Sequence, residues 1–171
     1  MRISFVKHGI FALAMVFSTS AALAATQNVT ANVRFITPLS FTDVTNINFG
    51  TVTAGVAATY TITTAGVAST VGGEYLSGTP VVGSVKINGS AFQTINISVT
   101  HGAAVSGVSV TASTCNYNAA GVASPCVVSG GAAPTSTGKT LLIGATVSAD
   151  GNQVDSNTPI SPVITITVVY T

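Results

Sequence analysis

Charged side chains are scarce in this sequence. Five Lys and Arg and four Asp and Glu make up 5% of the 171 residues. Two of the basic residues, Arg2 and Lys7, stand at the very start of the chain. Three basic and four acidic residues follow, for a net charge of −1: Arg34, Lys86, Lys139, Asp43, Glu74, Asp150 and Asp155. So weak and slightly negative a charge excludes capture of nucleic acid or of an anionic membrane as the main task.

Residues that carry catalysis and sugar binding are also few. The chain has no tryptophan, four tyrosines and two histidines, of which His101 lies in the body of the sequence beside Gly102. A hydrolase needs a nucleophile, a base and a group that orients the base, and no such set is recognisable. We expect no enzymatic activity, no cofactor and no metal site, and the lack of tryptophan weighs against sugar binding.

Long hydrophobic runs are confined to the N-terminus. A basic start is followed by a mostly apolar stretch over residues 10–23 and by the small residues Ala22-Leu23-Ala24. This pattern indicates a secretory signal peptide over residues 1–24, cleaved between Ala24 and Ala25. The alternative, a membrane anchor, is disfavoured because the stretch is short for a span. We therefore expect an exported protein of the periplasm, cell surface or extracellular space, with one domain over residues 25–171 and no membrane span in it.

Cysteine occurs only twice, at Cys115 and Cys126. In an exported chain such a pair predicts a disulfide, which at this spacing would close a short local loop. A redox-active site is the alternative, but that chemistry uses a Cys-x-x-Cys pair.

Threonine, serine and asparagine supply most of the polar residues, and they alternate with apolar ones. In "QTINISVT", residues 93–100, Ile95, Ile97 and Val99 fall on one side of an extended strand. The same period of two recurs in seven other segments, at residues 28–35, 47–52, 59–64, 83–89, 108–113, 140–148 and 163–171. No stretch has helical periodicity. The final segment places Ile164, Ile166, Val168 and Tyr170 on one face.

Glycine- and proline-containing turns separate these segments, as at residues 71–78, 129–138 and 150–162. About eight short strands with such spacing are typical of an antiparallel, immunoglobulin-like β-sandwich. A closed barrel fits the periodicity equally well. The turn "DGNQVD", residues 150–155, offers oxygens that could bind calcium, but it lacks the acidic spacing of a calcium loop and reads better as a plain turn.

The order of several motifs resembles a known family. "ITPLSF" (36–41), "INFGTVTAG" (47–55), "GSVKINGSAFQTINISV" (83–99) and the terminal "ITVVY" (166–170) follow one another in the chain. This resembles a bacterial secreted domain family of unknown function with an early L/I-x-F-G motif and a terminal V-x-V-x-Y strand. That family is similar to spore coat protein U and to subunits of chaperone–usher pili.

The resemblance implies an incomplete, pilin-like sandwich whose missing strand comes from a neighbour, by β-strand addition. Within residues 25–36, Val29, Ala31, Val33 and Phe35 have the alternation that a donor strand needs. The other interpretation makes the same segment the domain's own first strand.

The leading hypothesis is thus a structural subunit of a surface appendage or coat. Its partners would be copies of itself or related subunits, with a periplasmic chaperone and an outer-membrane usher as assembly factors. The alternative is a monomeric extracellular or outer-membrane-associated adhesin or other binding module.

Overall fold

The computed structural model describes residues 26–171, which contain β-strands and no helix. Residues 35–171 form one compact unit, and residues 26–34 belong to a separate one. The predicted signal peptide, with its cleavage point between Ala24 and Ala25, lies outside the described residues. No helix in the described part of the chain is long and apolar enough to cross a membrane.

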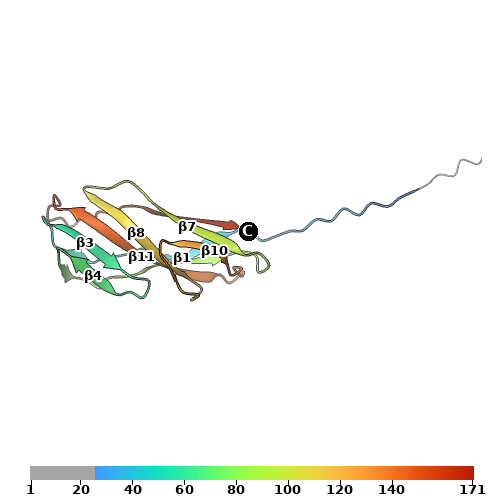
Figure 1. The fold of residues 1–171 in the computed structure, drawn as a ribbon, viewed down its shortest axis with the longest axis horizontal. Helices are drawn as coiled ribbons and strands as arrows, with labels where there is room; N and C mark the ends of the chain where they lie inside the picture. Colours follow the sequence, from blue (N-terminus) through green and yellow to red (C-terminus); the bar gives the residue numbers. More distant parts are fainter. Residues whose placement is uncertain (1–25) are drawn as a thin grey trace, which may run out of the picture. The chain divides into compact units, whose positions relative to one another are not determined.

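The compact unit is built from two main antiparallel sheets, which confirms the all-β sandwich expected from the two-residue periodicity (Figure 1). The larger sheet has seven strands and the second sheet has three. The larger sheet contains β1 (Ser40–Thr45), β3 (Ala57–Ile62), β4 (Ala68–Val71), β6 (Gly83–Asn88), β8 (Val108–Tyr117), β9 (Val122–Ala123) and β11 (Lys139–Asp150). The second contains β7 (Ile95–His101), β10 (Val127–Gly131) and β12 (Ile164–Tyr170), and β2 (Thr51–Val52) pairs with β5 (Tyr75–Ser77).

Strand β11 organises the larger sheet. Along one side it pairs with β8, and along the other it pairs first with β6 and then with β3. Because β11 has neighbours on both sides, its inward side chains Leu141, Ile143 and Ala145 are buried. In the second sheet β7 is central, with β10 on one side and β12 on the other, and β7 and β12 run side by side in Figure 1.

The core lies between the two sheets and confirms most of the inward faces read from the sequence. Ile95 and Ile97 of β7 are completely buried against Val85 and Ile87 of β6. Beside β7 in the same sheet, Ile166, Val168 and Tyr170 of β12 pack on this cluster, but their side chains remain only partly buried. The two rows thus pack on the same core, but the β12 row is covered less deeply than Ile95 and Ile97. The reason is positional, since β12 has a strand on one side only.

The predicted disulfide is present and connects the two sheets. Cys115 lies in β8 of the larger sheet, and Cys126 stands immediately before β10 of the smaller one. Their Cα atoms are 5.0 Å apart, and both side chains are buried. The eleven-residue separation suggested a purely local staple. The chain crosses from one sheet to the other within that interval, so the bond fastens the sheets together.

The structure does not support the interpretation of residues 28–35 as the domain's own first strand. None of these residues is in a β-ladder, and the described chain enters its first strand only at Ser40. Val29 and Phe35 are 91% and 89% exposed. Proline at position 38 separates the segment from β1, because it cannot donate a ladder hydrogen bond.

Several strands were also missed in segments read as turns. Strands β4 and β5 lie within residues 68–77, and β10 overlaps the glycine-rich stretch that follows Cys126. These strands are short and contain Gly, Ser or Ala, so their own sequence carries little β signal. Their pairing with longer neighbours, β4 with β3 and β10 with β7, makes them strands.

Candidate functional site

The outer edge of β12 is an unpaired sheet edge. Its seven residues pair antiparallel with β7 in an unbroken register, from Ile164 opposite His101 to Tyr170 opposite Ile95. No other strand among residues 26–171 pairs with it. Thr165, Thr167 and Val169 point away from the core, and neither charge nor proline interrupts the strand. Such an edge presents a row of free backbone N–H and C=O groups to another strand.

The inward row of β12 is what makes this edge unusual. Ile166, Val168 and Tyr170 pack on the main core cluster, and Ile164 packs on a second cluster built around Tyr60 and Val147. All four side chains keep part of their surface exposed. An added strand would therefore find both hydrogen-bonding groups and apolar surface to cover.

Strand β1 is one of the edge strands of the larger sheet. It pairs only with β6, and Phe41 lies opposite the buried Ile87, so its ring is on the core side of the sheet. The Phe41 side chain is nevertheless 47% exposed. Leu39 and Ile47, which flank the strand, also pack on the core while staying partly exposed. The edge strands β1 and β12 thus both carry core-facing apolar side chains that stay partly exposed.

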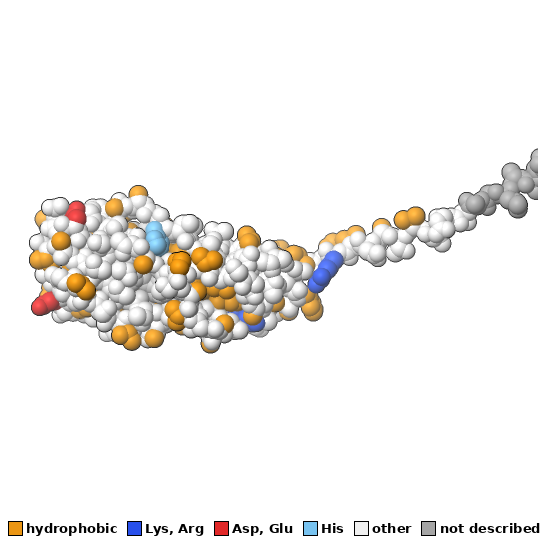
Figure 2. Space-filling model, viewed as in Figure 1, with side chains coloured by type: hydrophobic (Ala, Val, Ile, Leu, Met, Phe, Trp, Pro, Cys, Tyr) orange, Lys and Arg blue, Asp and Glu red, His pale blue; other side chains and the backbone are white. Residues whose placement is uncertain are grey.

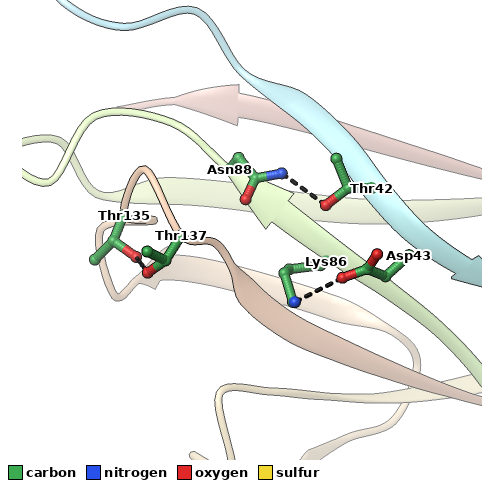
Figure 3. Close-up of polar contacts among 6 residues, drawn as sticks. All are labelled: Thr42, Asp43, Lys86, Asn88, Thr135 and Thr137. Carbon is green, nitrogen blue, oxygen red and sulfur yellow. Dashed lines mark hydrogen bonds and ion pairs between the residues drawn. The ribbon is translucent and has the colours of Figure 1, made fainter.

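The β1 edge is also irregular, and Figure 3 shows the polar side-chain contacts between β1 and β6 at this edge. The register shifts between Thr42 and Thr45, and Asp43 adopts a positive φ of 51°. Lys86 Nζ lies 2.6 Å from Asp43 Oδ2, and Asn88 Nδ2 donates to Thr42 Oγ1 at 2.8 Å. A bulge with a charge beside it blunts an edge against pairing. Of the two edges, β12 is the one with a regular ladder.

The hydroxyl of Tyr170 ties three segments together at the end of β12. It donates to the Thr37 carbonyl oxygen at 2.6 Å and accepts from the Ser90 N–H at 2.6 Å. Thr37 precedes β1 and Ser90 follows β6, so the contact spans both sheets. No sequence pattern indicates these partners, which are more than 75 residues away in the chain.

Residues 29–35 are the segment that the sequence suggested as a donor strand. Val29, Ala31, Val33 and Phe35 are all exposed in extended chain. Their spacing matches the inward row of β12, because Val29–Phe35 and Ile164–Tyr170 both span seven residues. Figure 2 shows how sparse charged side chains are on the viewed face and how many hydrophobic ones reach the surface.

Residues with catalytic or ligand-binding potential lie apart from these edges or are already engaged. His101 Nε2 is 3.0 Å from Ser113 Oγ, a pairing that the sequence did not predict. Ser113 is buried, and none of the hydrogen bonds within residues 26–171 links His101 to a carboxylate. Nor does that part of the chain bring three His, Cys, Asp or Glu residues together around a metal position.

The turn at residues 150–153 is closed on itself. Asp150 Oδ1 accepts hydrogen bonds from the Asn152 backbone N–H at 2.9 Å and from Gln153 Nε2 at 2.7 Å. These bonds, the backbone one first, lower the pKa of the Asp150 carboxyl. Gln153 Nε2 also donates to the Ser106 carbonyl oxygen. These hydrogen bonds hold the turn together and tie it to the segment before β8.

Comparison with known proteins gave no match of this chain to a family model, to a curated protein or to a solved structure.

Proposed function

We propose that this protein is an exported structural subunit that assembles with copies of itself by β-strand addition, into a surface appendage or coat. The observation that carries the proposal is the coexistence of an unfinished edge and a segment that fits it. Strand β12 pairs regularly with β7, and its other edge is unpaired. Its inward apolar row is partly exposed. The same chain carries an unpaired segment with matching alternation and length.

The geometry of the compact unit favours donation between molecules over self-completion. Thr37 is held at the C-terminal end of β12 by the Tyr170 hydroxyl. Residues 29–35 of the same chain lead up to Thr37. If they lay along β12, they would therefore have to run parallel to it. The segment of a second molecule is free to run antiparallel, as every other pair in these sheets does, and antiparallel pairing is slightly more stable per residue.

The low charge of the chain supports the same reading. A surface with few charges offers little repulsion between copies, and β-strand addition draws its affinity from main-chain hydrogen bonds and apolar pockets rather than from ion pairs. Residues 28–33 contain no charged side chain, and neither does β12.

The proposal is tested by separating donor and acceptor. A chain that begins at Thr37 keeps all twelve strands, because residues 26–36 contribute none of them. We expect this chain to fold, to remain monomeric and to bind a synthetic peptide of residues 25–36, whereas the chain of residues 25–171 forms multimers. Size-exclusion chromatography and titration with a labelled peptide measure these outcomes.

Two peptides provide a matched control. A Val33→Asp peptide places a charge on the inward row and should lose binding, while an Asn32→Asp peptide places the same charge one residue away on the outward side and should retain it. A chain of residues 25–171 that stays monodisperse and monomeric at high concentration would contradict assembly and favour the monomeric binding module instead.

One feature favours that second candidate. A hollow of about 400 Å³ lies on the larger sheet, lined in part by Asn116, Asn118 and Thr140. Its amide and hydroxyl groups could hold a polar ligand. None of its lining residues is aromatic, so it lacks the stacking surface that sugar sites commonly use, and the assembly proposal has the stronger support.

A further inference from the structure

Charged side chains are divided between the two ends of the compact unit. Strand β11 begins at Lys139, which lies opposite Ile87 near the end of β6, and it finishes at Asp150, which lies opposite Ala57 at the start of β3. An extended strand of twelve residues separates its first and last residues by about 36 Å. We refer to these two ends of the compact unit as the Lys139 end and the Asp150 end.

The Asp150 end carries three of the four acidic residues of the sequence, Glu74, Asp150 and Asp155. Residues 53–55 hold their segments together, because backbone N–H groups of this loop donate to the Glu74 and Gln153 carbonyl oxygens. All three acidic residues are exposed. On the face drawn in Figure 2, the acidic atoms lie at one end of the compact unit. The Asp150 end is therefore the acidic end.

The Lys139 end bears two exposed apolar side chains, Ile36 and Phe92, which are 44% and 81% exposed. Phe92 lies in the loop after β6, and the hydroxyl at the end of β12 joins this loop to the segment before β1 that contains Ile36. The Gly89 N–H donates to the Thr135 carbonyl oxygen, which ties the same loop to the segment before β11. A basic residue and an apolar surface thus occur together at this end.

The Asp150 end is apolar between its carboxylates. The Gly102 N–H donates to the Val163 carbonyl oxygen at 2.8 Å, and the Asp150 N–H donates to the Gly107 carbonyl oxygen at 3.1 Å. The loops at residues 102–107 and 150–163 therefore lie together. They carry three exposed valines, Val105, Val154 and Val163. Both ends thus present hydrophobic surface that the single copy leaves uncovered, with charge of opposite sign beside it.

We infer that these two ends form a second contact between copies, head to tail, an inference that rests on the proposed strand addition. A donor segment that runs antiparallel to β12 directs its Phe35 toward Ile164, at the Asp150 end of the acceptor. Thr37 follows two residues later and is held to the donor's own compact unit. Two residues span at most about 7 Å. The donor's Lys139 end must therefore lie against the acceptor's Asp150 end.

Apolar surface and charge have different roles in this contact. The apolar side chains of the two ends cover one another, which favours association. Exposed ion pairs add little affinity, but opposite signs at the two ends favour a head-to-tail encounter over a head-to-head one. Asp43 does not oppose this, because it lies 2.6 Å from Lys86 and the two charges offset each other. Arg34, which precedes the donor's Phe35, adds a second positive charge beside the neighbour's acidic end.

Cross-linking between chains of residues 25–171 tests the contact directly. Copies carrying Phe92→Cys are mixed with copies carrying Val154→Cys, assembled, and treated with a flexible bis-maleimide, and the dimeric product is quantified on gels and by peptide mass. Thr111→Cys is the matched control for Val154→Cys, because Thr111 is exposed in the interior of β8, beside Thr146 of β11. We expect the Phe92→Cys and Val154→Cys mixture to give about tenfold more product than Phe92→Cys with Thr111→Cys, since contact raises the effective concentration of the two thiols.

A charge substitution tests the role of the opposite signs. Lys139→Gln removes the positive charge from its end, and Thr111→Asp makes the same change in net charge away from both ends. We expect Lys139→Gln to slow the initial rate of assembly about twofold relative to Thr111→Asp at about 0.02 M NaCl. The difference should disappear at about 0.5 M NaCl, where charges are screened over short distances. Light scattering follows both rates, and the final amount of assembled protein should stay the same.

The possible failures are distinguishable. If multimers form but the Phe92→Cys and Val154→Cys mixture cross-links no better than its Thr111→Cys control, the head-to-tail contact is wrong while strand addition stands. Equal rates for Lys139→Gln and Thr111→Asp at low salt would also contradict a contact between ends of opposite charge. If the chain of residues 25–171 forms no multimers, strand addition itself fails and the contact fails with it.

Discussion

At the scale of single residues, the structure shows contacts of side chains to which the sequence assigned no partner. Tyr170 is the clearest case, since its position in an alternating strand indicated only an inward ring. The hydroxyl contacts a carbonyl oxygen and an N–H group from two segments that are distant in the chain. His101 and Ser113 are a second case. They lie on strands of different sheets, and no sequence motif relates them.

Asp150 provides a residue-scale prediction about pH. Hydrogen bonds from Asn152 and Gln153 lower its pKa in the folded protein, so the carboxyl binds a proton more weakly folded than unfolded. Its contribution to stability is therefore present above the unfolded pKa of 3.8 and is lost as the pH falls through the lower folded value. We expect Asp150→Asn, which keeps an acceptor oxygen, to flatten the acid limb of stability. Urea unfolding at pH 7 and between about pH 2 and pH 4 measures this; identical acid limbs in the two proteins would contradict it.

At the scale of elements, what distinguishes β7 from β12 is their place in the sheet. Both strands have well-formed alternation, and their inward residues face each other in register. Ile97 is buried, whereas Ile166 keeps part of its surface exposed. Alternation reports which residues share a face, but the number of neighbouring strands decides how deeply that face is covered.

This difference predicts unequal costs of truncation. Ile97→Ala should lower the free energy of unfolding of the monomer by about 2–4 kcal/mol, because it leaves a cavity in a closed core. Ile166→Ala should cost distinctly less, since the site is partly wet before the change. Thr165→Ala, on the exposed face of β12, is the control and should fall within about 0.5 kcal/mol of the parent. Denaturant unfolding of the chain that begins at Thr37 compares all three, and equal costs for Ile97 and Ile166 would show that the β12 edge is already covered.

At the scale of the whole molecule, the scarcity of charge shapes how copies would meet. Within residues 29–35 and β12, Arg34 and Tyr170 are the only ionisable side chains. Added salt screens exposed charges over about 10 Å at 0.1 M, which leaves main-chain hydrogen bonds and apolar contacts unaffected. We expect assembly of residues 25–171 to change little between about 0.05 and 0.5 M NaCl, with sodium sulfate promoting it by strengthening apolar burial. Light scattering across the salt series checks this, and multimers that dissolve in NaCl would indicate an electrostatic interface.

The sequence by itself determined the fold class, the disulfide and the inward faces of the principal strands. A two-residue period and β-branched polar residues favour extended structure, and two cysteines allow only one intramolecular pairing. The rows Tyr60–Ile62, Val85–Ile87 and Ile95–Ile97 accordingly lie in the core as read. Only the tertiary structure decided that residues 28–35 stay outside the ladders while the weaker Ser40–Thr45 becomes a strand, that the disulfide joins two sheets, and that β12 is an edge. These outcomes depend on which strands lie next to one another, and strand adjacency follows from contacts between residues far apart in the chain rather than from local alternation.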